Sequence, residues 1–306
     1  MDNRIGCIFV TERKLGIAGL QLKKRPGDTE KNLRNLERTV RLTKRKYPWV
    51  DLLFVGELYL QPYGDRDWKE YATPIPNETT ERLCELSQEV DCWLVPGSFL
   101  EKEGNKIFNT AVAINPQGEV VAKYRKIFPW APHEDTDYGT DFVVFDIPDV
   151  ARIGLTICYD VWFPEIFRTL VWMGAEVVLQ PSATYTPDRR AELILTRAQA
   201  IMNQCYVLNS NVIQAQGGGL SLFVGPEGRV LQEAGTNEEV MIEAVDIDRV
   251  HWLRQHGSFA IDPVWKCLRD SPLEGKFPVY ENLKAGEVFK ELGATRIQDS
   301  LREWRE

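Results

Sequence analysis

Three positions far apart in the chain combine a reactive side chain with an abrupt change from apolar to polar sequence. Cys158 ends one apolar run, Glu57 follows another after a single glycine, and Lys126 ends a strand-like stretch. A thiol can act as a nucleophile, a carboxylate as a general base and an ammonium group as a stabiliser of developing negative charge. These three residue types together form a set suited to nucleophilic catalysis.

Cys158 has surroundings that could activate a thiol. A free thiol has a pKa of about 8.5, so a nucleophilic cysteine needs a cation, a helix N-terminus or an adjacent base. The chain must reverse between Cys158 and a helix expected to open near Pro164, and backbone N–H groups at such a bend can face an oxyanion. Unpaired cysteine is also often buried, so a core sulfur is the alternative interpretation of Cys158 taken alone.

Short strands alternating with helices would have to position these residues. Apolar runs rich in Val, Ile and Phe predict strands over 5–10, 51–55, 92–99, 108–114, 119–124, 142–147, 151–157, 176–182, 205–212, 220–224 and 239–247. The sequence PQGE predicts a tight turn and a hairpin over 108–125. Because strands in one sheet deliver their ends to a common edge, we expect Glu57, Lys126 and Cys158 to meet there.

Helices are predicted between the strands. Asp28 is expected to cap one that runs to residue 46, and Asn77 a second that carries Leu83 and Leu86 on one face. Two more are predicted over 164–174 and 188–203. This alternation predicts an α/β protein with a mixed sheet covered by helices.

Two segments are expected along the chain. Residues 1–256 carry the alternating pattern without internal repeats or linkers, so they are expected to form one domain. Residues 257–306 are aromatic, contain proline and are weakly periodic, which is typical of an extension that packs on a neighbouring subunit.

Composition and charge limit the partners. The chain has 306 residues, a net charge of -8 and 43% hydrophobic content, which allows a large core but no basic field for nucleic acid or anionic lipid. Its apolar runs are too short to cross a bilayer, and its start does not resemble a secretion signal. The six cysteines form no CxxC pair, which argues against a zinc site or a disulfide framework. We therefore expect a cytoplasmic protein with reduced thiols.

Longer segments around the three positions resemble the signature motifs of a known family. GELYLQPYG, YRKIFPWAPHE and ICYDVWFPEIFR are similar to the Glu, Lys and Cys segments of the nitrilase superfamily of carbon–nitrogen hydrolases. Further segments at 97–126, 197–211 and 225–235 follow in the family's order, and the stretch after Lys126 is most similar to the aliphatic amidase and formamidase branch. Several motifs in order favour the catalytic interpretation of Cys158.

The resemblance implies a role for each matching residue. Glu57 would be the general base, Lys126 the oxyanion stabiliser, Cys158 the nucleophile and Glu134 the second glutamate of the family's site. The implied reaction is hydrolysis of an amide to a carboxylic acid and ammonia through a cysteine thioester. An N-carbamoyl (ureide) substrate, a nitrile substrate and a non-catalytic scaffold are the alternatives. The family usually has proline before the base, and Gly56 is expected to leave that bend looser.

The resemblance also implies a fold and an assembly. The family adopts a four-layer α-β-β-α sandwich and pairs into homodimers or higher homo-oligomers through helices and a C-terminal arm. It implies no metal and no cofactor, and His251 and His256 lie on different faces of a helix at their spacing.

Aromatic residues near the motifs are candidates for the walls of a substrate pocket, with core packing as their alternative. The candidate substrate-binding residues are Tyr63, Trp130, Tyr159, Trp162 and Tyr185. Arg189 follows Pro187 at a predicted helix start and is expected on the surface, with contact to a substrate carboxylate as the alternative.

Overall fold

The computed structural model describes residues 12–61, 68–290, 292 and 295. The helices are α1 (Thr29–Lys46), α2 (Glu78–Val90), α3 (Pro164–Trp172), α4 (Arg189–Asn203), α5 (Ile247–His256), α6 (Val264–Arg269) and α7 (Pro278–Glu281). The strands are β1 (Lys14–Gln21), β2 (Leu52–Val55), β3 (Trp93–Val95), β4 (Ser98–Glu103), β5 (Lys106–Ile114), β6 (Val120–Arg125), β7 (Val144–Ile147), β8 (Ala151–Leu155), β9 (Val177–Ser182), β10 (Tyr206–Asn211), β11 (Ile213–Gln214), β12 (Gly217–Gly218), β13 (Leu222–Val224), β14 (Val230–Glu233) and β15 (Glu239–Asp246).

Two mixed sheets form the centre of the fold. A seven-stranded sheet has the order β15-β1-β2-β3-β5-β4, with β6 also paired to β5, and a six-stranded sheet has the order β14-β13-β10-β9-β8-β7. Strands β1, β2 and β3 are parallel neighbours, and so are β8, β9 and β10. The remaining pairs within both sheets are antiparallel.

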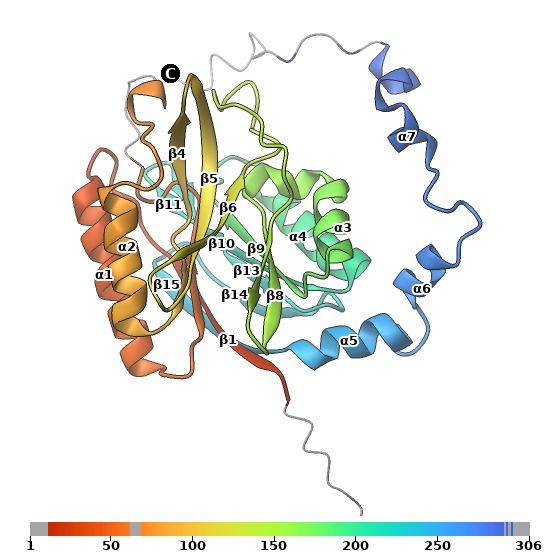
Figure 1. Cartoon of the computed structure of the whole chain (residues 1–306), viewed down its shortest axis with the longest axis horizontal. Helices are drawn as coiled ribbons and strands as arrows, with labels where there is room; N and C mark the ends of the chain where they lie inside the picture. The colour runs from red at the N-terminus through yellow and green to blue at the C-terminus, as the bar shows by residue number, and fades with distance from the viewer. Residues whose placement is uncertain (1–11, 62–67, 291, 293–294, 296–306) are drawn as a thin grey trace, which may run out of the picture.

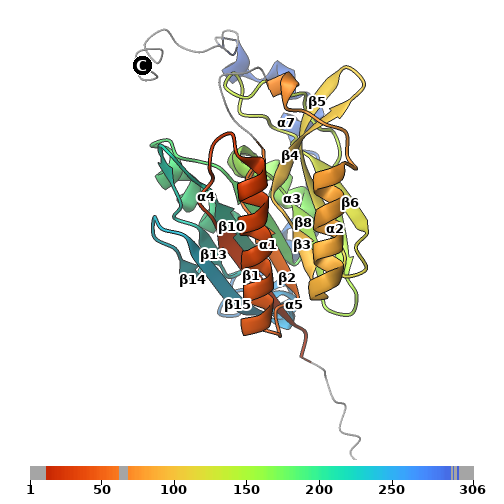
Figure 2. The ribbon, with the colours of Figure 1, turned by 90° about the vertical axis from the view of Figure 1, so that its left-hand side faces the viewer.

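Apolar packing joins the two sheets and their helices into four layers. Buried side chains of both sheets meet in one core, where the rings of Phe54 and Phe223 stack with centroids 5.8 Å apart. A second core packs α1 and α2 on the seven-stranded sheet, and a third packs α3 and α4 on the six-stranded sheet (Figure 1 and Figure 2). Each fully buried Leu, Ile or Phe contributes about 1.5–3 kcal/mol, so these cores dominate stability. The expected α-β-β-α sandwich is confirmed.

Local sequence signals set the ends of the first two helices. Asp28 accepts a hydrogen bond from the Lys31 amide at 3.0 Å and so caps α1. Asn77 and Thr80 bond reciprocally at 3.0 and 2.7 Å and form a capping box at the start of α2. Such caps satisfy amide groups that have no partner inside the helix. Both predicted helix starts are confirmed.

The strand predictions differ from the structure at several places. The predicted strand 5–10 lies outside the described residues, and β1, which pairs with both β2 and β15, was not predicted. The predicted strand 92–99 is two strands, β3 and β4, because Gly97 has a φ of +86° and turns the chain. Strand β14 was not predicted either.

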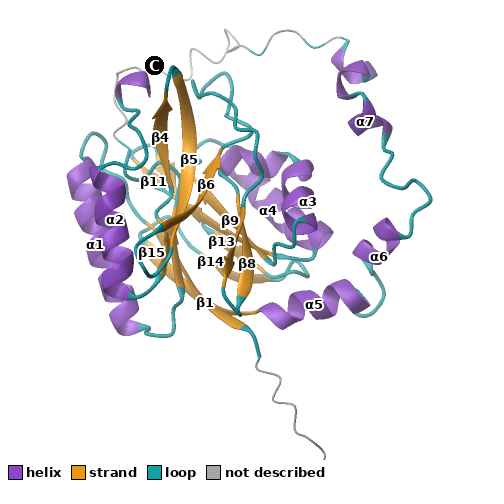
Figure 3. Ribbon diagram, viewed as in Figure 1, coloured by secondary structure: helices purple, strands orange, loops and turns teal. Residues whose placement is uncertain are grey.

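The segment after α5 runs outside the four layers as an extended arm (Figure 3), and the Tyr280 hydroxyl of α7 donates to Glu165 on α3 at 3.4 Å. The segment is anchored near its start, where the Trp265 indole N–H donates to the Asn203 carbonyl at 3.0 Å and the Arg168 guanidinium lies over the Trp265 ring. Farther along, α7 exposes apolar side chains, among them Val279 and Tyr280. Within the described ranges, no helix combines the length and apolar character needed to span a bilayer.

Candidate active site

The three predicted site residues lie just beyond strand ends of two different sheets. Glu57 follows β2 and Lys126 follows β6, both in the seven-stranded sheet, whereas Cys158 follows β8 in the six-stranded sheet. The expectation that a single sheet edge would gather them is therefore wrong. The two sheets pack face to face, and their ends together supply the site.

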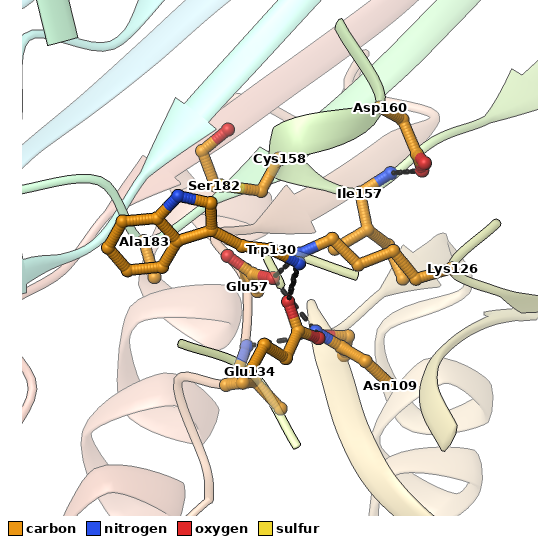
Figure 4. A network of polar contacts seen from close by, with 12 residues as sticks. Glu57, Asn109, Lys126, Trp130, Glu134, Ile157, Cys158, Asp160, Ser182 and Ala183 are labelled. Atoms are coloured by element: carbon orange, nitrogen blue, oxygen red, sulfur yellow. Dashed lines mark hydrogen bonds and ion pairs between the residues drawn. The ribbon is translucent and has the colours of Figure 1, made fainter. Parts of the chain in front are cut away.

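A buried lysine between two carboxylates forms the centre of the site (Figure 4). The Lys126 Nζ lies 2.8 Å from Glu57 Oε1 and 2.7 Å from Glu134 Oε2. Lys126 is 1% exposed, Glu57 5% and Glu134 7%. Charges removed this far from water are stable only when paired and hydrogen-bonded, and this geometry provides both.

Asn109 on β5 joins the two carboxylates and was missed in the sequence. Its Nδ2 donates to Glu57 Oε1 and to Glu134 Oε1, both at 2.8 Å, so one amide group holds both glutamates in place. The side chain is completely buried. The available signal was a polar asparagine inside a strand whose other residues are mostly apolar.

The environment displaces the pKa values of the two glutamates in opposite directions. Burial raises the pKa of Glu57, and repulsion from Glu134 helps to keep it above its ordinary value although Lys126 lowers it. Burial also acts to raise the pKa of Glu134, but Lys126 and hydrogen bonds from Trp130 and Asn109 outweigh it and lower that pKa. Glu57 is therefore the carboxylate that takes up a proton more readily.

The lysine and the thiol respond to the same charges. Burial acts to lower the pKa of Lys126, but Glu134 and Glu57 hold it well above its ordinary value, so the ammonium stays charged. Burial raises the pKa of the Cys158 thiol well above its ordinary value, and the charge of Glu57 raises it further. The resting sulfur is therefore a protonated thiol that needs a base.

A strained turn presents Cys158 toward the cluster. Cys158 has a φ of +47°, a left-handed conformation that is uncommon outside glycine, and it begins the 3₁₀ helix η2 (Cys158–Trp162). Figure 4 shows Cys158 on the side of the cluster opposite to Glu134 and Asn109. Such a turn after a strand exposes a nucleophile and its neighbouring amide groups.

Asp160 ties this turn to the loop that follows Lys126. Its Oδ2 accepts from the Ile157 amide at 2.9 Å and from the Tyr124 hydroxyl at 2.7 Å, and its Oδ1 accepts from the Phe128 amide at 3.0 Å. Burial raises the pKa of Asp160 to about 6, although these three donors and Lys126 oppose the rise. The nucleophile turn and the lysine loop are thus fixed to each other through one buried carboxylate.

Gly56 places Glu57 by close approach and not by looseness, so that expectation is wrong. A Cβ at Gly56 would lie 2.7 Å from the Ser182 carbonyl oxygen and 2.8 Å from the Val212 amide nitrogen. The Glu57 amide donates to the same Ser182 carbonyl at 3.1 Å. Only glycine lets the end of β2 approach β9 this closely, and the contact fixes the backbone of Glu57.

The residues after Glu57 are held from two further sides. The Leu58 amide donates to Ser98 Oγ at 3.1 Å, and the Leu58 carbonyl accepts from the buried Lys24 Nζ at 2.7 Å. Leu58 has a φ of +50°, so this bend would be unstable without such contacts.

The aromatic residues predicted to line the pocket differ in their contacts and in their exposure. Trp130 extends across the same group of side chains (Figure 4), and its amide donates to Glu134 Oε2 at 2.9 Å. Tyr159 follows Cys158 directly and packs edge-on to Phe163. Trp162 and Tyr185 are more exposed, and Tyr63 lies outside the described residues.

Arg189 is buried, so the expectation of a surface position is wrong. It is 4% exposed and pairs with Glu192 at 2.9 Å, while its Nη2 donates to Asn209 Oδ1 at 2.5 Å. Glu192 also accepts from the Ser182 hydroxyl at 2.8 Å. This network ties the start of α4 to β9 and β10 and engages Arg189 with side chains of the chain itself.

Comparisons with known proteins identify the family of the chain. Residues 16–255 match the model of the carbon-nitrogen hydrolase family. Omega-amidase NIT2 of Homo sapiens is 32% identical over 220 residues, covering 67% of this chain and 79% of the relative. A formamidase of Bacillus cereus (strain B4264) is 32% identical over 214 residues, covering 68% of this chain and 63% of the relative.

A solved structure extends the comparison to the fold. Nit3 of Saccharomyces cerevisiae, a member of branch 10 of the nitrilase superfamily, superposes with a TM-score of 0.73 at 27% identity. The match covers 79% of this chain and 94% of the yeast chain. The family resemblance seen in the motifs is confirmed by both kinds of comparison.

Proposed function

The chain belongs to the carbon–nitrogen hydrolase family, and we propose that it hydrolyses small amides to a carboxylic acid and ammonia with Cys158 as its nucleophile. It is a hydrolase of carbon–nitrogen bonds other than peptide bonds. The observation that carries the proposal is the buried Lys126, held between Glu57 and Glu134 beside the Cys158 thiol.

The first half of the reaction forms a thioester. Glu57 takes the thiol proton as the Cys158 sulfur attacks the amide carbon, and it then gives that proton to the departing nitrogen. The carbon–nitrogen bond breaks, ammonia leaves and the acyl group stays on sulfur. The raised pKa of Glu57 supports this role, because a carboxyl that both accepts and donates a proton works best with a pKa nearer neutrality.

Lys126 supplies positive charge to the oxyanion. An ammonium group has three N–H donors, and within the described part of the chain two of them are directed at Glu57 and Glu134. The third is available to the carbonyl oxygen of the substrate, together with the backbone N–H of Tyr159. Each such donor accelerates acyl transfer by about 10²–10³-fold.

The second half of the reaction releases the acid. Glu57 accepts a proton from water, the resulting hydroxide attacks the thioester, and the proton returns to sulfur as the acid leaves. Glu134 remains ionised throughout, and its lowered pKa supports that assignment. Its role is to keep the Lys126 ammonium group charged and directed at the substrate oxygen.

Amides are the substrate class that the relatives favour. The two curated relatives named above are an omega-amidase and a formamidase, both of which act on amides. Trp130 extends across the cluster (Figure 4), and Tyr159 follows Cys158 directly in the chain, so both are candidates for apolar walls of the substrate site. Trp162 and Tyr185 are exposed. Small primary amides fit a site in which the catalytic groups are almost fully buried.

The same proposal extends to assembly and compartment. The exposed apolar side chains of the C-terminal segment and of α3 and α4 would be covered in a homodimer or larger homo-oligomer. A nucleophilic thiol must stay reduced, and the cysteines of the described segments are unpaired. Both points favour a reducing compartment such as the cytoplasm.

Ammonia release from a panel of short primary amides, N-carbamoyl compounds and nitriles tests this function. We expect the amides to turn over fastest and Cys158→Ala to abolish turnover while its thermal unfolding stays near that of the parent protein. Mass spectrometry of acid-quenched reactions should find the acyl group on the Cys158 peptide. Faster turnover of ureides or nitriles would reassign the substrate, and no turnover in any class would favour a non-catalytic scaffold.

A further inference from the structure

We propose that the Thr184 hydroxyl is a further catalytic group, which donates a hydrogen bond to the Cys158 sulfur and stabilises its thiolate during attack. The proposal rests on the function proposed above and adds a residue that touches the reacting atom. Thr184 lies in the loop after β9, and its Oγ1 is 3.4 Å from Cys158 Sγ. That separation is within hydrogen-bonding range for a sulfur atom.

The backbone of Thr184 is fixed so that its hydroxyl stays at the sulfur. The side chain of Asn211 holds it on both sides, with Oδ1 accepting from the Thr184 amide and Nδ2 donating to the Thr184 carbonyl, each at 2.8 Å. Asn211 is itself completely buried at the end of β10, and its backbone N–H donates to Ser221 Oγ at 2.8 Å. A loop residue held by a buried strand end is positioned as firmly as a residue of the sheet.

The direction of the hydrogen bond follows from the proton transfer. In the resting thiol either Cys158 or Thr184 can be the donor. Once Glu57 has taken the thiol proton, the sulfur has only lone pairs, so the Thr184 hydroxyl must donate to it. Hydrogen bonds to an ionised partner are stronger than those between neutral groups. The contact therefore strengthens as the sulfur gains negative charge.

The site benefits from such a donor because proton transfer moves a negative charge onto a buried sulfur. Two carboxylates flank the single ammonium group, and once Glu57 is protonated the one excess negative charge of the cluster lies on the Cys158 thiolate. Burial and Glu57 raise the pKa of the Cys158 thiol, whereas Lys126 and the hydrogen bond from Thr184 lower it. A neutral donor stabilises the thiolate without adding another charge to be paired.

The pH profile of Cys158 alkylation separates this role from a packing role. The rate of iodoacetamide reaction at the Cys158 peptide would be followed by mass spectrometry from neutral to alkaline pH in the parent protein and three variants. Thr184→Val removes the hydroxyl at constant shape, and Thr184→Ser keeps it. Thr186→Val is the matched control, because the Thr186 hydroxyl in the same loop is bonded to Asp188 and not to Cys158.

We expect Thr184→Val to move the midpoint of the profile up by about one pH unit, which is about a tenfold slower reaction at neutral pH. At alkaline pH its rate should equal or exceed that of the parent, because a thiolate with fewer hydrogen bonds is more nucleophilic. Thr184→Ser and Thr186→Val should follow the parent profile.

Three results would overturn the proposal. These are an unshifted midpoint in Thr184→Val, a Thr184→Ser profile that follows Thr184→Val, and a uniform loss of rate at every pH. The midpoint is measured whatever the absolute rate. If Thr184→Val shifts the alkylation midpoint but the parent protein turns over no amide, that result counts against the proposed hydrolase chemistry and not against the hydrogen bond.

Discussion

Lys126 separates two glutamates that differ in their surroundings more than in their distance from the lysine. Glu134 accepts hydrogen bonds from Lys126, Asn109, the Trp130 amide and the Thr136 hydroxyl. Glu57 accepts from Lys126, Asn109 and the Cys158 thiol. More donors stabilise the ionised form, so the carboxylate with fewer donors takes up a proton more readily. This difference lets one residue type serve both as base and as permanent counter-ion.

The first prediction concerns the charge of Glu134. Glu134→Gln should lower kcat/KM by about 10–100-fold, because the new amide N–H₂ would face donors in a buried site. Glu57 must be ionised to accept a proton, so activity is lost as the pH falls through its pKa. Removing the Glu134 charge removes a cause that raises this pKa. The acid limb of the kcat/KM profile should therefore move to lower pH.

A matched variant shows whether the loss of a carboxylate matters only inside the buried cluster. Glu103→Gln removes a carboxylate from an exposed ion pair with Arg125, outside the buried cluster, and should leave the acid limb where it is. An acid limb that stays fixed or rises in Glu134→Gln would contradict the proposed division of roles.

The sequence allowed prediction of site residues only where a reactive side chain interrupts an apolar pattern. Glu57, Lys126 and Cys158 each stand at such a boundary, and the family motifs added Glu134. Asn109 lies inside β5, and Thr184 follows the end of β9 but carries a hydroxyl side chain that is common in loops. Their positions depend on which strand ends meet in space, and that depends on packing between sheets and not on local sequence.

At the scale of elements, the site depends on how closely the end of β2 approaches the ends of β9 and β10. Gly56 allows this contact, because a side chain there would overlap the Ser182 carbonyl and the Val212 backbone. A second glycine, Gly97, lies against Gly56, since a Cβ at Gly97 would be 2.1 Å from the Gly56 carbonyl oxygen. Two glycines thus make room for the turn that carries the base.

The second prediction follows from this contact. Gly56→Ala must push β2 away from Ser182 and so displace Glu57, and a shift of about 1 Å at a catalytic group can reduce the rate about 10²-fold. Overpacking should also lower the free energy of unfolding by about 1–3 kcal/mol. Steady-state kinetics and thermal unfolding measure the two effects.

Gly225→Ala is the control for adding a methyl group to a glycine elsewhere in the fold. There the new Cβ would meet its nearest neighbour, Leu231 Cδ2, at 3.6 Å, which is ordinary contact. This variant should keep nearly full activity. Parent-like kinetics in Gly56→Ala would show that the close approach does not position Glu57.

Glycine also explains why a central strand was missed. The β1 sequence KLGIAGLQ has few of the branched residues that favour strands, because Gly16 and Gly19 stand where neighbouring groups come close. A Cβ at Gly16 would lie 2.1 Å from the Trp49 carbonyl oxygen, and one at Gly19 would lie 2.6 Å from the Phe223 ring. Tertiary packing here overrides the local preference that a single sequence displays.

At the scale of the whole molecule, the four layers account for residues up to α5, and the segment after it is arranged differently. Phe259 and Ile261 are 83% and 79% exposed, and Leu283 and Val288 are also exposed in the single chain. The family resemblance predicted that this segment packs on a second subunit, and that remains a prediction. Apolar side chains on an extended segment need a partner surface to be buried.

The third prediction tests that partner surface. Leu283→Asp combined with Val288→Asp should shift the protein toward monomers in sedimentation equilibrium, because each fully buried Leu or Val contributes about 1.5–3 kcal/mol to an interface. The fold of one chain should be unaffected, since both side chains are exposed within it. Asn282→Asp adds one negative charge, half of what the double variant adds, at a position that is already polar and exposed, and it should leave the mass distribution unchanged. An unchanged mass in the double variant would place any subunit interface elsewhere on the molecule.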